Sequence, residues 1–131
     1  MLVLIVSRSL RIIERLEEII SESQSITVIH RAYSYEEANK LIRRNNYDIA
    51  ILDIDFWENE SLQLLKDMRK TYEKLCIIVL FTPMDNCINE QCKSIGVDFL
   101  LDKYYHFEKL GGLLEMHHLM TSLDLVKNSG K

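Results

Sequence analysis

The chain has 131 residues, a formal net charge of -4, 47% hydrophobic residues and 27% charged residues. A chain of this length can bury the core of one domain, and this composition excludes disordered and collagen-like chains. The acidic balance argues against a nucleic-acid-binding surface, which is normally basic. We therefore expect one globular, cytoplasmic domain that binds neither nucleic acid nor membrane.

The apolar runs and the cysteines agree with this expectation. The longest apolar runs, Leu2–Val6 and Ile77–Phe81, are far shorter than the roughly 20 residues that span a bilayer. No basic lead precedes the first run, so it does not resemble a signal peptide. Cys76, Cys87 and Cys92 lack the spacing of zinc ligands or of a disulfide framework. We expect them to be reduced and to pack as small apolar side chains.

Short β-branched runs alternate with longer segments of helical period along the chain. The predicted strands are Leu2–Val6, Ile26–His30, Ile49–Asp53, Ile77–Phe81 and Asp98–Leu101. They are apolar throughout, which is typical of parallel strands covered on both faces. The predicted helices are residues 9–22, 35–45, 61–73, 85–95 and 106–121.

Residue choices at the helix ends and faces support these assignments. Ser34 and Glu37 form the pattern of a capping box, and Gly96 is a helix-stop signal. The third helix should bury Leu62, Leu65 and Met68. The other inward residues predicted are Ile12, Ile13, Leu16, Ile19 and Ile20 in the first helix and Leu110, Leu113, Leu114 and Leu119 in the last.

Five successive strand–helix units predict an α/β fold with helices on both faces of a parallel sheet. Right-handed connections and this length favour the flavodoxin-like, doubly wound (βα)5 arrangement with strand order 2-1-3-4-5. We expect this domain to occupy residues 1–121 and residues 122–131 to form a flexible polar tail. Ligands of such folds bind at the carboxyl ends of the strands.

Charged side chains follow the predicted strands at that edge. Asp53 ends the third strand, and Lys103 follows the fifth. A carboxylate can act as the covalent nucleophile toward a phosphoryl group, and a lysine can hold that group as a point charge. These two residues therefore suggest phosphoryl chemistry.

Four stretches, LVLIV, YDIAILDID, IIVLFT and GVDFLLDK, resemble the receiver domain of bacterial two-component response regulators. The resemblance covers about residues 1–121. It implies that Asp53 is the phosphoacceptor, that Lys103 contacts the phosphoryl group and that the backbone carbonyl of Asp55 helps to hold Mg²⁺. It also implies a histidine kinase or a downstream signalling protein as partner, and no enzymatic activity.

The chain departs from the receiver pattern at several positions. Ser7 and Arg8 occupy the positions of the acidic pair that holds Mg²⁺ in the family. The switch hydroxyl falls on Phe81, which we expect to be a core residue. Thr82, one residue later, could contact the phosphate in its place if the loop is shorter by one residue.

These departures predict weak Mg²⁺ binding. Mg²⁺ prefers octahedral oxygen coordination that usually includes one or two carboxylates. A positive charge at Arg8, about 5 Å from the metal, would repel each unit of the metal's charge by about 3 kcal/mol at an effective dielectric constant near 20. Two roles of Arg8 stay open: it pairs with Asp53, or it is an exposed loop residue.

Three aromatic residues near the predicted site are candidates for partner contact. Trp57 follows Asp53, and Tyr104 and Tyr105 follow Lys103. In receivers, the face made by helix 4, strand 5 and helix 5 is where partners and second copies dock, so the resemblance implies a homodimer face there. The alternative is that these are ordinary surface aromatics.

Three functions are consistent with these observations. The first is an atypical receiver that acts through protein contact, with weak or absent Mg²⁺-dependent phosphorylation. The second is a working phosphoacceptor that uses Asp53, with Arg8 and Thr82 in supporting roles. The third is a flavodoxin-like cofactor binder, which is disfavoured because the loop SRSLR has no glycine to cradle a phosphate.

Overall fold

The computed structural model describes the chain except for residues 23–27, 55–58, 82–86, 104–108 and 114–131. Its strands form one five-stranded parallel sheet in the order β2-β1-β3-β4-β5, so the predicted fold and strand order are confirmed. The strands are β1 (Leu2–Val6), β2 (Val28–Ala32), β3 (Ile49–Ile54), β4 (Cys76–Phe81) and β5 (Phe99–Asp102). The helices are α1 (Leu10–Ser21), α2 (Tyr35–Arg44), α3 (Asn59–Thr71) and α4 (Cys87–Ile95), and residues 109–113 are also helical.

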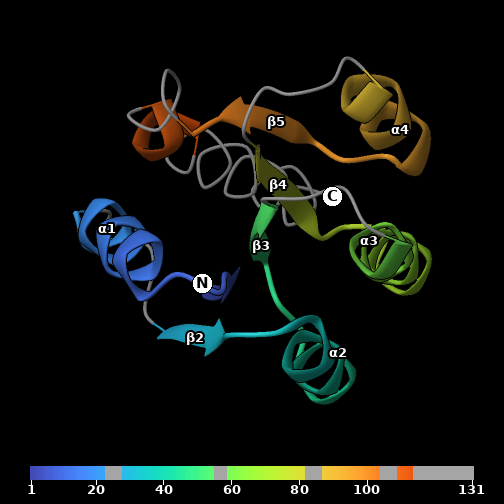
Figure 1. Ribbon diagram of the computed structural model, residues 1–131. Helices are drawn as coiled ribbons and strands as arrows, with labels where there is room; N and C mark the ends of the chain where they lie inside the picture. Colours follow the sequence, from blue (N-terminus) through green and yellow to red (C-terminus); the bar gives the residue numbers. More distant parts are fainter. Residues whose placement is uncertain (23–27, 55–58, 82–86, 104–108, 114–131) are drawn as a thin grey trace, which may run out of the picture.

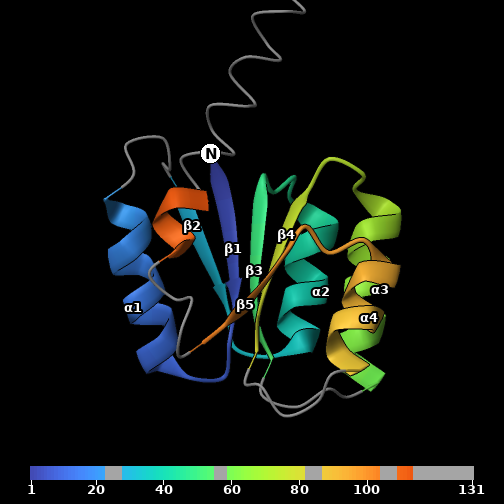
Figure 2. The same cartoon turned by 90° about the horizontal axis from the view of Figure 1, so that it is seen from above.

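Helices cover the sheet on both faces (Figure 1, Figure 2). Helix α1 and the helical residues 109–113 lie on one face, while α2, α3 and α4 lie on the other. Successive strand residues alternate between the two apolar cores, as the pleat of a strand requires. In β3, for example, Ile51 packs with the α1 core and Leu52 with the opposite core.

Strand β2 differs from the sequence prediction in position and in burial. It is described from Val28 to Ala32 and so extends two residues beyond the predicted end at His30, because its hydrogen-bonded register with β1 pairs Val6 with Ala32; residues 26 and 27 lie outside the described residues. It is also not apolar throughout, since Val28 is 46% exposed and Arg31 is exposed. As an edge strand β2 is paired on one side only, so its residues tolerate contact with water.

Two aspartates each connect the residue before one strand to the start of the adjacent strand: Asp48 precedes β3 and contacts β1, and Asp98 precedes β5 and contacts β4. The Asp48 carboxylate accepts the Leu2 backbone N–H at 2.8 Å, and the Asp98 carboxylate accepts the Ile77 N–H at 2.7 Å. Asp98 also pairs with Arg69 of α3 at 2.6 Å. These contacts align the amino ends of the strands and thereby align their carboxyl ends, where the site lies.

Serine side chains cap the first two helices, and the cap at Ser34 was predicted. Ser9 accepts the Ile12 N–H at the start of α1, and Ser34 accepts the Glu37 N–H at the start of α2. The Glu37 carboxylate reaches back to the Tyr33 N–H at 2.9 Å, one residue before the cap. The capping pattern therefore located the start of α2 correctly.

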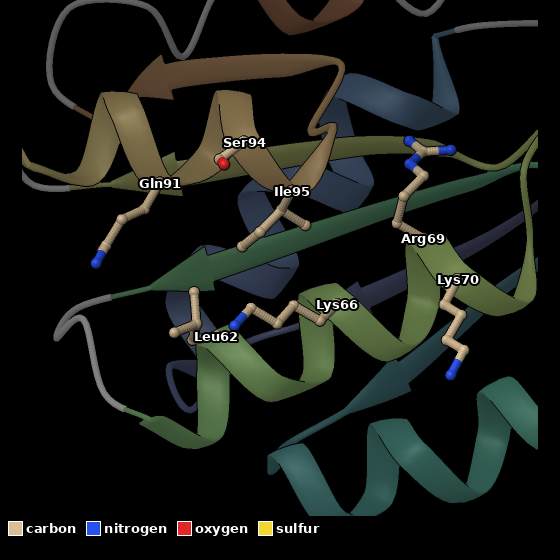
Figure 3. A pocket seen from close by; sticks show the side chains of 7 residues that line it. All are labelled: Leu62, Lys66, Arg69, Lys70, Gln91, Ser94 and Ile95. Carbon is tan, nitrogen blue, oxygen red and sulfur yellow. The ribbon is translucent and has the colours of Figure 1, made fainter.

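Helix α3 begins two residues earlier than predicted, at Asn59, and part of its buried face was predicted wrongly. Leu64, Leu65 and Met68 are buried, while Leu62 is only half-buried. The buried residues are spaced by one, three and four positions, which defines one helical stripe, and Leu62 lies beside it. Leu62 instead faces the space between α3 and α4 (Figure 3).

Substitution of two glycines by alanine should change stability in opposite directions. Gly96 ends α4 with a φ of +97°, where a side chain is strained, so Gly96→Ala should lower the free energy of unfolding by about 1 kcal/mol. Gly112 is helical and exposed, and an added Cβ would meet nothing within 4 Å. Gly112→Ala should therefore raise the free energy of unfolding by roughly 0.5–1 kcal/mol. Urea unfolding monitored by circular dichroism measures both, and a stabilising Gly96→Ala would contradict the assignment of the turn.

Leu110 is buried and Leu113 packs partly against the α1 core, as predicted, whereas residues 114–131 lie outside the described residues. Burial raises the pKa of the Cys76 thiol to about 12 and that of Cys92 to about 11, so both stay protonated apolar fillers at neutral pH. The side chain of Cys87 lies outside the described part. Among the helices described, none has the length and apolarity needed to cross a membrane.

Candidate functional site

The sheet register brings Ser7 beside Asp53. Strands β1 and β3 are parallel neighbours, and Val6 is paired with Leu52. The next residue of each strand is therefore at the same height, at the carboxyl end of the sheet. Ser7 and Asp53 lie on the face covered by α1, because Ile5 and Ile51, two residues earlier, pack in that core.

Both carboxylate oxygens of Asp53 have a partner. The Ser7 hydroxyl donates a hydrogen bond to Oδ2 at 2.6 Å, and the Lys103 ammonium forms an ion pair with Oδ1. The Asp53 side chain is 1% exposed and that of Lys103 is 9% exposed, so the pair is almost completely removed from water. Burial makes this arrangement stable only while both partners are present.

The Ser7 hydroxyl is held in place by the start of α1. The Ser9 backbone N–H donates to Ser7 Oγ at 3.0 Å, and Ser9 itself caps the helix. The proton of the hydroxyl is directed toward Asp53, because Oδ2 at 2.6 Å is a closer and charged acceptor compared with the Ser9 carbonyl at 3.4 Å. Ser7 therefore connects the first turn of α1 to the buried carboxylate.

The backbone of β4 positions Lys103. The Lys103 N–H donates to the Phe81 carbonyl at 3.0 Å, which extends the pairing of β4 and β5 by one residue. This places the Lys103 side chain on the same face as Leu101, which packs in the α1 core. Asp102, which is also buried, lies on the opposite face by the alternation of the strand and so points away from Asp53.

Arg8 does not pair with Asp53 in the structure. It is exposed, and its guanidinium carbon is 5.5 Å from the centroid of the Tyr35 ring, a cation–π contact. Among the described residues the ion pair of Asp53 is with Lys103. The physical reason is the alternation at the end of β1: because Ser7 faces Asp53, the next side chain faces away.

Phe81 also differs from its prediction as a core residue. It is the last residue of β4, its side chain is half-buried, and it belongs to neither apolar core. The strand ends there, so the packing that buries the preceding residue Leu80 does not extend to it. Its contribution to the site is the backbone carbonyl that accepts the Lys103 N–H.

Comparison with known proteins identifies the family. The model of the response regulator receiver domain matches residues 3–115. The chain belongs to this family. It is thus a receiver domain of two-component signalling, with Asp53 and Lys103 in contact at the carboxyl edge of its sheet.

Individual relatives agree with the family assignment. The protein-glutamate methylesterase/protein-glutamine glutaminase of Trichodesmium erythraeum is 36% identical over 77 residues, which are 59% of this receiver domain chain and 22% of that protein. The probable C4-dicarboxylate response regulator DctR of Bacillus subtilis is 26% identical over 102 residues, 77% of this chain and 45% of that protein. The chain therefore spans less than half the length of these curated relatives.

Solved structures show the same fold. The receiver domain of the Francisella response regulator 1452 superposes with a TM-score of 0.76 at 22% identity, covering 92% of this chain and 98% of that structure. At this identity the similarity establishes the fold and nothing finer. The carboxyl edge of the receiver sheet is therefore the place to look for this chain's chemistry.

Five predicted site residues, namely Asp55, Trp57, Thr82, Tyr104 and Tyr105, lie outside the described residues. Sequence reasoning also missed one feature of the receiver site. It treated Ser7 as a lost metal ligand and did not identify its hydrogen bond to Asp53. The sequence did contain a signal, since adjacent parallel strands that end at the same height place Ser7 and Asp53 side by side.

Proposed function

We propose that this receiver domain acts through contact with partner proteins and that its Asp53 is phosphorylated weakly or not at all with Mg²⁺. One observation carries the proposal: the buried Asp53 carboxylate is engaged by Ser7 on one oxygen and by Lys103 on the other. A metal ion or a phosphoryl donor that approaches Oδ2 would compete with the Ser7 hydroxyl for that oxygen. The start of α1 holds that hydroxyl in place.

The donor set around Asp53 does not fit Mg²⁺. Mg²⁺ binds oxygen ligands in octahedral geometry and usually includes one or two carboxylates. Where the family has an acidic pair, this chain has a neutral hydroxyl at Ser7 and a cation at Arg8. Among the described residues, no three Asp, Glu, His or Cys side chains gather into a metal site.

The Asp53–Lys103 pair has a structural role in this proposal. It connects the end of β3 to the residue that follows β5, with β4 between them. The pair would thereby fix the end of β5, and Tyr104 and Tyr105, which follow it in the sequence, stay candidates for partner contact. The partner we propose is a histidine kinase or a downstream signalling protein, and a second copy of the chain could use the α4–β5 side.

A phosphoacceptor role is the second candidate, and the Lys103 contact favours it. In that reaction an Asp53 oxygen would attack the phosphorus atom of the donor, and the bond from phosphorus to the leaving atom would break, which is the imidazole nitrogen of a phosphohistidine or the carboxyl oxygen of acetyl phosphate. Lys103 would remain beside the new acyl phosphate and balance part of its charge. Ser7 would have to release Oδ2 first.

Intact-mass spectrometry after incubation with acetyl phosphate and Mg²⁺ separates the two candidates. We expect no added phosphoryl group, because Ser7 and Arg8 stand where the family has the acidic pair that holds the metal beside Asp53. The Asp53→Ala variant serves as the control for phosphorylation at other residues. Phosphorylation of the natural chain that is absent from Asp53→Ala would refute the proposal and establish the second candidate.

The single tryptophan, Trp57, provides an independent measurement. Its position four residues after Asp53 in the sequence makes its fluorescence a reporter of the site. We expect no change of fluorescence on addition of Mg²⁺ or of beryllofluoride, a phosphoryl mimic. A saturable change with both, lost in Asp53→Ala, would also contradict the proposal.

A further inference from the structure

A groove between α3 and α4 is separate from the Asp53 site (Figure 3). It has a volume of about 420 Å³. Leu62 and Lys66 of α3 face Gln91 and Ile95 of α4 across it. The other residues that line it are Arg69, Lys70 and Ser94.

The groove carries positive charge without an acidic lining residue. Lys66 and Lys70 are exposed, lie one helical turn apart, and have no ion-pair partner among the described residues. Arg69 is different, because it is held by Asp98 and by the carbonyl of Gly96. Two uncompensated lysines therefore stand beside the groove of a chain whose net charge is -4.

The floor of the groove is apolar. Leu62 and Ile95 are half-buried, one from each helix, and their side chains face the groove. Water at this floor lacks hydrogen-bond partners from either side chain, so an apolar group that displaces it gains burial. Gln91 and Ser94 add side-chain hydrogen-bonding groups along α4.

We propose that this groove binds a short acidic segment of a partner protein, with one apolar side chain on Leu62 and Ile95 and carboxylates near Lys66 and Lys70. From Leu62 to Lys70 the helix rises by about 12 Å, which matches three or four residues of an extended peptide. The partner's negative charge complements the two free lysines. The site acts independently of phosphate at Asp53.

The charge distribution favours a peptide over nucleic acid or a second copy. A nucleic-acid backbone needs a longer basic surface than two lysines on an acidic chain. A second copy offers no purely acidic helix among those described, because α1 and α2 both carry arginine or lysine as well as glutamate. Both alternatives are outcomes of the experiment below.

The test is fluorescence anisotropy with a fluorescein-labelled peptide of sequence EDELEDE, added to the full chain at low salt. We expect saturable binding that Lys66→Glu weakens by about fivefold or more, with a similar effect of Lys70→Glu. The control Lys74→Glu makes the same charge change at an exposed position outside the groove, and it should change affinity by less than about twofold. The uncharged peptide QNQLQNQ should bind more weakly than EDELEDE.

Three outcomes would overturn the proposal. An equal loss of affinity in Lys66→Glu and Lys74→Glu would show attraction to net charge alone. Tighter binding of a uridine oligonucleotide than of the peptide would assign the groove to nucleic acid. Self-association in sedimentation velocity that Lys66→Glu abolishes would assign it to a second copy. Circular dichroism verifies that each variant is folded. If Lys66→Glu is not folded, Lys66→Gln takes its place.

Discussion

Replacement of Lys103 with alanine is expected to lower the free energy of unfolding of this receiver domain by about 3 kcal/mol. The reason is the burial of its partner, since the Asp53 side chain is 1% exposed and its Oδ1 is paired with the Lys103 ammonium. Loss of the ammonium leaves a buried negative charge that, among the described residues, retains the Ser7 hydroxyl as its side-chain partner. Urea unfolding monitored by circular dichroism measures the change.

A double-mutant cycle isolates the pair from the packing of the lysine stem. The cycle compares the single variants Asp53→Asn and Lys103→Met with the double variant, which removes both charges and should recover most of the stability that Lys103→Met loses. Lys93→Ala is the matched control, because Lys93 is exposed on α4 and should cost less than about 0.5 kcal/mol. If Lys103→Ala costs no more than this control, the buried pair does not stabilise the fold.

Introduction of an acidic pair is expected to strengthen Mg²⁺ binding on the order of 100-fold. The double variant Ser7→Asp/Arg8→Asp replaces the hydroxyl on Asp53 with a second carboxylate and removes a nearby cation. At an effective dielectric constant near 20, each added charge pair at 4–5 Å contributes about 3 kcal/mol, of which desolvation offsets a part. Isothermal titration calorimetry with Mg²⁺ measures the affinity, and acetyl phosphate tests whether phosphorylation of Asp53 follows.

Two controls show whether the added carboxylates act locally. Arg44→Asp makes the same charge reversal at the exposed end of α2 and should leave Mg²⁺ affinity within about twofold of the natural chain. Ser7→Ala removes the hydrogen bond to Asp53 without adding a ligand. It therefore distinguishes the effect of freeing the Asp53 carboxylate from the effect of adding new metal ligands. Mg²⁺ binding by the natural chain as tight as that of the acidic-pair variant would contradict the proposed function.

The sequence determined most of the architecture because its local patterns agree with one another. The apolar run Leu2–Val6 became β1 without a change of bounds, and the run Ile49–Asp53 became β3 with one further residue. The cap at Ser34 and the stop at Gly96 also lie where residue preferences placed them. Apolar runs, caps and glycine turns report local conformation, which the sequence encodes directly.

Errors arose where a neighbour in space overrode the local pattern. The end of β2 at Ala32 follows from its pairing with β1, which no property of the predicted strand's own residues could reveal. Leu62 has the hydrophobicity of a core residue, yet the stripe through Leu64, Leu65 and Met68 left it beside the core, where it lines the groove against α4. Half-burial of this kind depends on the position of the adjacent helix.

The candidate site could likewise be predicted from the sequence only in part. The sequence by itself determined that Asp53 and Lys103 follow parallel strands, and hence that a carboxylate and an ammonium meet at one edge of the sheet. Only the tertiary structure decided that Lys103 pairs with Oδ1 of Asp53 and that Ser7, rather than Arg8, contacts Oδ2. It also decided that Arg8 lies over the Tyr35 ring. The physical reason is that residue order fixes which strand end a side chain follows, while strand register and the start of α1 decide the direction in which it points.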